Sequence, residues 1–410
     1  MRIEVIAVGD EVLRGEYLEN NSRFISQRLS EHGLTPWRVG ILGDDIDALS
    51  NEFAEAVKRS DIIIATGGLG PTVDDITKDA LIEAFKLKTE WNDRVLDEIK
   101  ARLRSYGREM PDSYKDQARV PAGSRIIPNT VGLAVGLDVT ISGSRIFLLP
   151  GVPAEMKEMF SRYVFPELAG GVEKRRVRIG IIGMTETEVE ERIEEFLGDI
   201  KEDISIISSP RGIELYMPVE FYEGAGGKGI KGALESYIFS PEGKTLNEVV
   251  VEKLIEINKT LAIAESFTGG LIASLIVDIP GASNTFLEGV VTYSNQAKVS
   301  ELGVERGTLE KYGAVSKEVC VQMAQGARER AGADLAVSTT GIAGPSGGSV
   351  EKPVGMCYMG LATEDDVYCL KKIFPGDRQM IRELASHYAL DILRLYLFGF
   401  TARLEALRVR

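Results

Sequence analysis

Short runs of β-branched residues alternate with amphipathic stretches from residue 1 to about residue 168. The runs include IEVIAVG, DIIIATGG and RIFLLPG, and NSRFISQRLSEHG is one of the amphipathic stretches. This alternation is typical of a parallel sheet whose faces are covered by helices. We therefore predict an α/β domain over residues 1–168.

A change of sequence pattern near residue 166 predicts a domain boundary. The link PELAGGVEKRRVRIGIIG leads into a strand, a helix and two more strands, which predict a small α+β module over residues 172–240. Five glycines between residues 224 and 232 predict a loop or hinge in this module. Strands and helices alternate again over residues 245–410 and end in a long helix from about 377 to 398, so we predict a second α/β domain there. The predicted fold class is multidomain α/β.

The composition of the 410 residues argues against several classes of protein. A formal charge of −14 argues against a general binder of nucleic-acid phosphates, because such binding depends on clustered Lys and Arg. No stretch approaches the roughly 20 apolar residues of a membrane-spanning helix. Three cysteines form neither an even disulfide set nor a CxxC pair. We expect a cytoplasmic protein without membrane or direct nucleic-acid binding.

The segment LAIAESFTGGLIASLI, residues 261–276, places a polar group between a strand and a helix. The strand is expected to end at Ala264, and Thr268, Gly269 and Gly270 would open the helix. Backbone N–H groups at a helix start have no intrahelical acceptor and can bind an oxyanion or a phosphate. Ser266 is therefore a candidate nucleophile, and a helix cap is the alternative interpretation.

A nucleophilic serine needs a base, and the chain holds only His32 and His387. This scarcity argues against a Ser-His-Asp triad and leaves a lysine of lowered pKa as the activating group. Lys298 follows a predicted strand, with Tyr293 five residues before it. The ends of strands are where α/β domains place their sites. The alternative is an ordinary solvent-exposed lysine at the start of a helix.

Residues 338–355 form a loop rich in glycine and hydroxyl groups, STTGIAGPSGGSVEKPVG. Such a loop lets backbone amides approach a phosphate or a ribose, although it could equally be an ordinary surface loop. Farther along, Asp377 and Arg378 stand at a predicted helix start. Asp377 could cap that helix, and Arg378 could meet an anion or a partner subunit.

A second candidate site lies in ATGGLGPTVDDITKDAL, residues 65–81. Glycines allow close approach to a phosphate, and paired carboxylates could hold a divalent cation that bridges diphosphate oxygens. Acidic pairs also follow the strand-like runs near residues 10 and 44, which favours a metal–nucleotide site. An acidic helix start is the alternative for one of the aspartates. The candidate residues are Gly67, Gly68, Gly70, Thr72, Asp44, Asp74 and Asp75.

Four motifs in order, AESFTGG, GVVTYSNQAK, TTGIAGPSGGS with KPVG, and FPGDR, resemble the C-terminal domain of the CinA family. That domain also occurs alone as nicotinamide mononucleotide (NMN) deamidase. The resemblance implies a metal-free amidohydrolase that converts NMN to nicotinate mononucleotide and ammonia. Phe267 stands where many members have cysteine, and we expect it to be a packing position.

The resemblance also assigns roles to residues. Ser266 would be the nucleophile, Lys298 its base, and Tyr293 a proton relay or an orienting hydroxyl. Backbone N–H groups of residues 268–270 would hold the oxyanion. The nucleotide part would be held by Thr339, Thr340 and Gly341.

The segments GDEVLRGE, TGGLGPTVDDIT and LPGVPAEM look like the molybdopterin-binding fold, in the version that heads CinA proteins. For that version the family implies an ADP-ribose pyrophosphatase that uses Mg²⁺, Mn²⁺ or Co²⁺ and forms AMP and ribose 5-phosphate. Asp44, Asp75 and the turn over residues 67–72 are the favoured site. The module over 172–240 is similar to a KH-type fold without a convincing GxxG clamp, so we interpret it as a spacer or dimerisation element.

Together these resemblances predict a bifunctional hydrolase of pyridine-nucleotide recycling that acts on NMN and ADP-ribose as a homodimer. Three alternatives remain open. The protein could be a non-catalytic nucleotide-binding adaptor linked to DNA uptake or recombination, it could retain only one of the two activities, or it could bind a molybdopterin.

Overall fold

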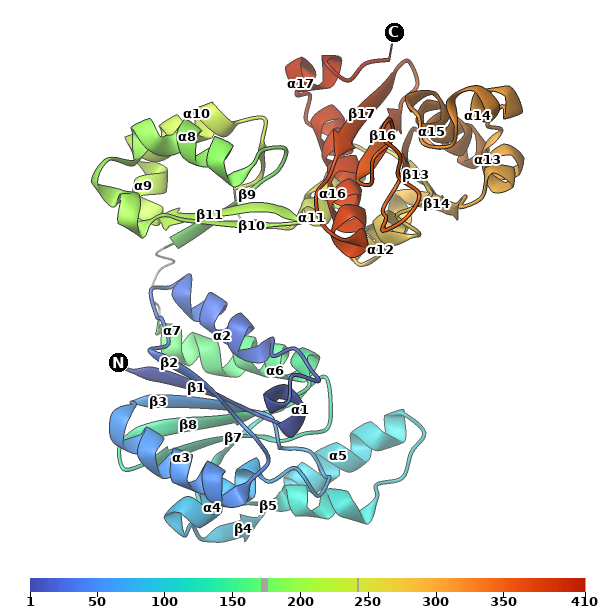
Figure 1. Ribbon diagram of the computed structural model, residues 1–410. Coiled ribbons are helices and arrows are strands. Elements are labelled where there is room, and N and C mark those ends of the chain that lie inside the picture. Colours follow the sequence, from blue (N-terminus) through green and yellow to red (C-terminus); the bar gives the residue numbers. More distant parts are fainter. Residues whose placement is uncertain (171–175, 242, 410) are drawn as a thin grey trace. The chain divides into compact units, whose positions relative to one another are not determined.

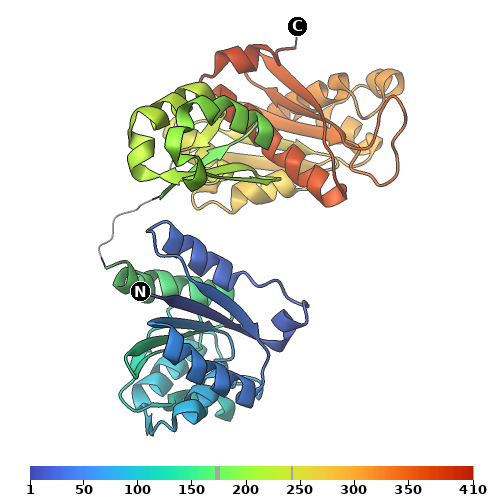
Figure 2. The same cartoon turned by 60° about the vertical axis from the view of Figure 1, so that its left-hand side comes forward.

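A computed structural model describes residues 1–170, 176–241 and 243–409 (Figures 1 and 2). The chain forms two compact units, Met1–Arg176 and Val177–Arg410, which are described separately. The predicted start of the middle module at residue 172 lies outside the described residues. No helix in the described ranges is long and apolar enough to cross a membrane.

The first unit contains a six-stranded sheet in the order β2-β1-β3-β8-β7-β6. The prediction of a parallel sheet holds for the four strands β2, β1, β3 and β8, whereas β7 pairs antiparallel with both β8 and β6. The reversal arises because Ser142 and Gly143, both with positive φ, form a tight turn that joins β7 to β8. The strands are β1 Ile3–Val8, β2 Arg38–Leu42, β3 Ile62–Thr66, β6 Arg125–Ile127, β7 Gly136–Ile141 and β8 Ser144–Leu149.

Helices cover both faces of this sheet (Figure 1). Successive side chains of a strand point to opposite faces, so Ile3 and Val5 of β1 pack with α2, α6 and α7, while Ile6 and Val8 pack with α3 and α4. A two-stranded ladder of β4 and β5 lies beside α5 and η1. The remaining elements are α1 Asp10–Leu13, α2 Asn21–Ser30, α3 Ile46–Arg59, α4 Thr77–Phe85, β4 Thr89–Trp91, α5 Asp93–Ser105, η1 Asp112–Ala118, β5 Arg119–Pro121, α6 Pro153–Met159, η2 Phe160–Val164 and α7 Phe165–Ala169.

The second unit begins with a four-stranded sheet, β10-β11-β9-β12, that is covered by helices. The predicted loop or hinge at the five glycines is wrong, because residues 225–234 form helix α10. A Cβ on Gly229 would lie 2.3 Å from the ring of Phe196 on α8, so glycine lets the two helices approach closely. The elements are β9 Arg176–Ile181, α8 Glu186–Leu197, η3 Gly198–Asp203, β10 Ser205–Ser209, β11 Gly212–Pro218, α9 Val219–Glu223, α10 Ala225–Leu234 and β12 Ile238–Ser240.

The same unit contains a five-stranded sheet in the order β14-β13-β15-β16-β17. β13 is parallel to β14 and β15, and β16 pairs antiparallel with both β15 and β17. Helices α11, α12 and α16 pack on one face, and α13, α14 and α15 on the other. The strands are β13 Leu261–Glu265, β14 Phe286–Val291, β15 Leu335–Gly341, β16 Met356–Ala362 and β17 Val367–Ile373. The helices are α11 Leu246–Glu256, α12 Leu271–Val277, η4 Ala282–Asn284, α13 Asn295–Leu302, α14 Arg306–Tyr312, α15 Lys317–Ala331, α16 Arg378–Leu397 and α17 Thr401–Glu405.

The long C-terminal helix is confirmed as α16, and Asp377 caps it by accepting the N–H of Met380 at 2.8 Å. Buried Arg394 of α16 donates to the backbone carbonyls of Ser236 and Ile238, at 2.7 and 3.2 Å, and to the carboxylate of Asp391. Charged groups in the interior are tolerated when their hydrogen bonds are satisfied. The small module is therefore fixed to the C-terminal sheet within the second unit.

Candidate functional sites

The end of β13 brings Ser266 against Lys298. Lys298 lies on α13, which follows the neighbouring parallel strand β14, so the two residues meet at one edge of the sheet. The Lys298 Nζ donates to the Ser266 Oγ at 3.0 Å and to the carbonyl of Thr292 at 2.7 Å. Ser266 is 8% exposed and Lys298 only 1%. The alternative of a solvent-exposed lysine is therefore wrong.

Burial is the cause of the unusual acidity of Lys298. It lowers the pKa of the ammonium to about 8. No carboxylate among the described residues pairs with Nζ, whose partners are the serine hydroxyl and two backbone carbonyls. An unpaired lysine with a pKa near 8 is partly neutral at moderate pH and can accept a proton from a neighbouring hydroxyl.

The carboxylate of Glu265 caps helix α12. It accepts the N–H groups of Gly270 at 3.0 Å, Ile272 at 3.2 Å and Ala273 at 2.9 Å. The cap is thus Glu265 rather than Ser266, which removes the alternative interpretation of Ser266. The sequence analysis missed this residue, although an acidic residue just before an apolar helix is a signal for such a contact.

The predicted oxyanion donors need a correction. The Gly270 N–H is bonded to Glu265, and the Gly269 N–H donates to the carbonyl of Ser266 at 3.1 Å. Within the described ranges, the amides of Phe267 and Thr268 have no protein acceptor. These two amides, directly after the serine, are the available donors for an oxyanion.

Phe267 is a packing residue, as predicted. Its side chain is buried in the core beside Gly341, where an added Cβ would lie 2.8 Å from the ring. The guanidinium of Arg382 on α16 donates to the carbonyls of Phe267 at 3.1 Å and Thr268 at 2.7 Å. Arg382, 115 residues away in the chain, thus holds the loop after Ser266 and was missed because no local pattern links the two.

The threonines that were expected to hold a nucleotide are engaged inside the protein. The hydroxyls of Thr268 and Thr339 bond to each other at 2.7 Å, and the Thr340 hydroxyl donates to the carbonyl of Ala314 at 2.7 Å. All three side chains are buried. These internal hydrogen bonds position β15 and the loop after Ser266.

Tyr293 and Arg378 form a second, exposed group. Tyr293 is 64% exposed, and its hydroxyl accepts from the Arg378 guanidinium at 3.2 Å. Arg378 also donates to the carbonyl of Gly344 at 2.9 Å. The Tyr293 hydroxyl is therefore engaged with Arg378, while only the backbone carbonyl of Tyr293 contacts Lys298, at 3.4 Å. A cation and a phenol at the surface suit an anionic group of a ligand.

The first unit contains a cavity of about 650 Å³ at the ends of β1 and β3. Most of the predicted site residues line it, and Thr72 is the exception because it lines a neighbouring cavity of about 230 Å³. The aromatic residues Tyr106 and Tyr114 also line the larger cavity and were not predicted. The predicted residues that line it are Asp44, Gly67, Gly68, Gly70, Asp74 and Asp75.

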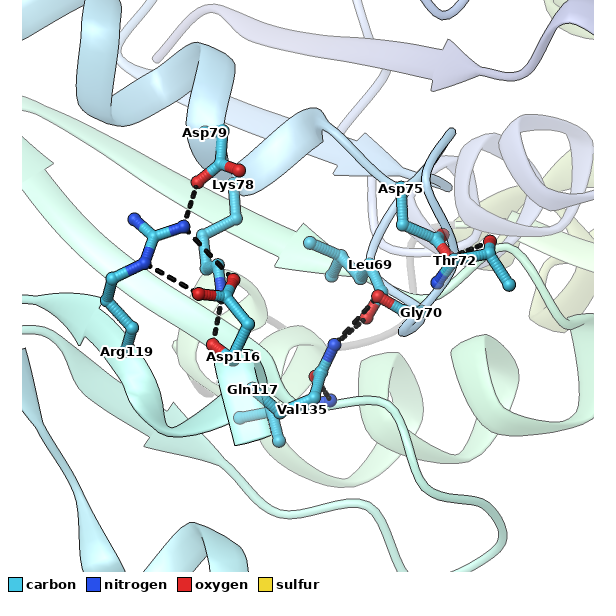
Figure 3. A network of polar contacts seen from close by, with 10 residues as sticks. All are labelled: Leu69, Gly70, Thr72, Asp75, Lys78, Asp79, Asp116, Gln117, Arg119 and Val135. Carbon is cyan, nitrogen blue, oxygen red and sulfur yellow. Dashed lines mark hydrogen bonds and ion pairs between the residues drawn. The ribbon is translucent and has the colours of Figure 1, made fainter. Parts of the chain in front are cut away.

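The glycine turn after β3 is forced by close backbone contacts. Gly67 has φ of 108°, and a Cβ there would lie 2.0 Å from the carbonyl oxygen of Val8. The turn closes through the N–H of Thr72, which donates to the carboxylate of Asp75 at 2.9 Å (Figure 3). Asp75 is thus a loop-closing residue.

Carboxylates gather around Asp44. Its pKa is raised, first by burial and then by the negative charges of Asp10, Glu11 and Asp74, against a lowering by the Asp10 N–H. Asp44 and Asp10 each accept the other's backbone N–H, at 2.9 and 3.1 Å. In the part of the chain that the structure describes, no three His, Cys, Asp or Glu side chains form a ready metal-binding group. The residues present fit a cation held by one or two carboxylates together with substrate phosphates.

Comparisons with known proteins match both ends of the chain to families. Residues 4–170 match the family described as "Probable molybdopterin binding domain", and residues 243–397 match "CinA C-terminal domain". A competence-damage inducible protein of Caldicellulosiruptor saccharolyticus is 43% identical over 98% of this chain and 100% of its own. A CinA-like protein of Kosmotoga olearia is 38% identical over 96% and 98%. A solved competence/damage inducible protein from Agrobacterium tumefaciens is 39% identical, covers 37% of this chain and 93% of its own, and has a TM-score of 0.37.

Proposed function

The chain belongs to the CinA family, and from this premise we propose that its C-terminal part hydrolyses the carboxamide of NMN to nicotinate mononucleotide and ammonia. One observation carries the proposal. The Lys298 Nζ lies 3.0 Å from the Ser266 Oγ in a buried site where no acid pairs with the lysine among the described residues. A serine beside a partly neutral lysine is an activated nucleophile for acyl transfer.

In the proposed reaction, neutral Lys298 accepts the proton of Ser266 while the serine Oγ attacks the carboxamide carbon. The amides of Phe267 and Thr268 stabilise the oxyanion of the tetrahedral intermediate. The lysine then gives its proton to the leaving nitrogen, which departs as ammonia. A water molecule attacks the acyl-enzyme with Lys298 as base, releasing the carboxylate and restoring the serine.

Arg378 and Tyr293 are proposed to hold the phosphate of NMN. Their side chains are exposed, and Tyr293 follows the strand that leads to Lys298. A guanidinium and a phenolic hydroxyl bind phosphate oxygens well. This assignment replaces the expected role of Tyr293 as a proton relay.

For the N-terminal part we propose hydrolysis of ADP-ribose to AMP and ribose 5-phosphate in the cavity of about 650 Å³. Asp44 and Asp74 would hold a divalent cation, Mg²⁺, Mn²⁺ or Co²⁺. The bound cation supplies charge neutralisation of the diphosphate. The glycine turn provides backbone N–H groups for phosphate oxygens, and the apolar wall with Tyr106 and Tyr114 suits the base of the nucleotide.

Two assays on the purified chain test both proposals. Ammonia release from NMN should persist with EDTA and fall by about 10³-fold or more in Ser266→Ala, while Ser300→Ala on the exposed side of α13 serves as the matched control. AMP release from ADP-ribose should stop with EDTA and be unaffected by Ser266→Ala. Ammonia release that survives Ser266→Ala would remove the serine from the mechanism. A folded chain without either activity would favour the non-catalytic adaptor.

A further inference from the structure

Gln117 connects two walls of the large cavity in the first unit. Its side-chain amide donates to the carbonyl of Leu69 at 2.9 Å and to the carbonyl of Gly70 at 2.8 Å, and its oxygen accepts the N–H of Val135 at 3.3 Å (Figure 3). Gln117 is 7% exposed and lines the cavity together with Leu69 and Gly70. Both donors and the acceptor of its amide group are thus used on the backbone of cavity-lining segments.

These contacts determine the direction of the N–H groups in the glycine turn. In a trans peptide the C=O and N–H groups point in opposite directions, so a Leu69 carbonyl held by Gln117 turns the Gly70 N–H away from Gln117. The Gly68 carbonyl accepts the N–H of Thr77 at 3.1 Å, so the Leu69 N–H points away from Thr77. Within residues 1–170, the N–H groups of Gly68, Leu69 and Gly70 have no protein acceptor.

The residues on either side of Gln117 in the chain, Asp116 and Arg119, form ion pairs that fix its position. The Lys78 Nζ donates to the Asp116 carbonyl at 2.6 Å and to its carboxylate at 3.0 Å. Arg119 donates to Asp116 at 2.8 Å and to Asp79 at 2.6 Å (Figure 3). These ion pairs attach the end of η1 to α4, the helix that follows the glycine turn. The position of Gln117 relative to the turn is therefore fixed by the residues that flank it in the chain.

We propose that Gln117 is a positioning residue that orients the Leu69–Gly70 peptide so that the free N–H groups of the turn receive the phosphate oxygens of a diphosphate ligand. The inference rests on the proposed N-terminal function and adds to it a residue outside the glycine and aspartate motifs. Successive N–H groups with no protein acceptor form a suitable anion site only if their peptides are held in one orientation.

The test is Gln117→Glu, which keeps the shape of the side chain and its acceptor but replaces the two donors by a carboxylate facing two carbonyls. The Leu69–Gly70 peptide then loses its fixed orientation. The KM for ADP-ribose and the dissociation constant of ADP, measured by calorimetry with Mg²⁺, should each rise by about tenfold or more, with a smaller change in kcat. Lowering the pH should partly restore both values in this variant alone, because a protonated carboxyl can donate again.

Gln27→Glu on α2 is the matched control, since it makes the same charge change at a side chain without a hydrogen bond to the turn. If Gln117→Glu does not fold, Gln117→Met removes the donors without adding charge. Unchanged KM and ADP affinity in a folded variant would overturn the inference. A wild type that binds ADP without hydrolysing ADP-ribose would refute the proposed activity while ADP affinity still tests Gln117. A wild type that does not bind ADP would overturn the inference as well.

Discussion

The two candidate sites differ in how completely the protein assembles them. In the second unit, nucleophile and base are in contact at 3.0 Å in a buried setting. In the first unit, the acidic residues and the glycine turn surround a cavity of about 650 Å³ without forming a complete cation site among the described residues. A site made of side chains can be complete before the substrate arrives. A site made of a cavity and backbone N–H groups is completed by its ligand.

The largest expected effect comes from removing the base of the preassembled site. Lys298→Met should lower kcat/KM for NMN by about 10³-fold, because the serine loses its proton acceptor. Hydrolysis of ADP-ribose should not change. Lys317→Met, at an exposed position of α15, is the matched control. Loss of less than about tenfold in ammonia release would show that Lys298 is not the base.

A pH profile should separate the two sites next. Only neutral Lys298 accepts a proton, so kcat/KM for NMN should rise with pH and level off above a pKa of about 8. The unfolded lysine keeps its ordinary pKa of about 10.4, so the unfolded chain binds more protons between the two values and stability should rise with pH in that window. A flat NMN profile between about pH 7 and 9 would contradict the proposed base.

The smallest effect on activity is expected at Phe267. Phe267→Cys should leave kcat/KM for NMN close to the wild-type value, because the ring packs in the core. The lost packing should lower the free energy of unfolding by about 2–4 kcal/mol, measured by denaturant titration. Phe267→Leu should cost less. A large change in activity with unchanged stability would give position 267 a chemical role.

Much of the fold and of the C-terminal site could be predicted because their signals are local. β1, β3 and β8 are short strands rich in apolar residues, and α16 has a capping aspartate and a long apolar pattern. Ser266 and Lys298 each follow a strand, and parallel strands end at one edge of a sheet. Their proximity therefore followed from the order of the elements.

The features that could not be predicted depend on contacts between distant segments. Glycine disfavours helices, yet residues 225–234 form α10, and the ring of Phe196 on α8 leaves no room for a Cβ at Gly229. Arg382 and Gln117 act on backbone carbonyls far away in the chain, which no sequence pattern records. The oxyanion prediction failed at Gly270 because a carboxylate five residues away takes its N–H.

The buried ion group around Arg394 determines how the second unit loses its structure. A small separation of the module from the sheet would remove the carbonyls of Ser236 and Ile238 from Arg394 before water could replace them. A partly separated state has a high free energy, because the guanidinium then lacks hydrogen-bond acceptors. In the folded state protein groups supply these acceptors, and in the unfolded state water does. We expect the module and the sheet to unfold in one cooperative transition, so that a weakening of either one lowers the melting temperature of both.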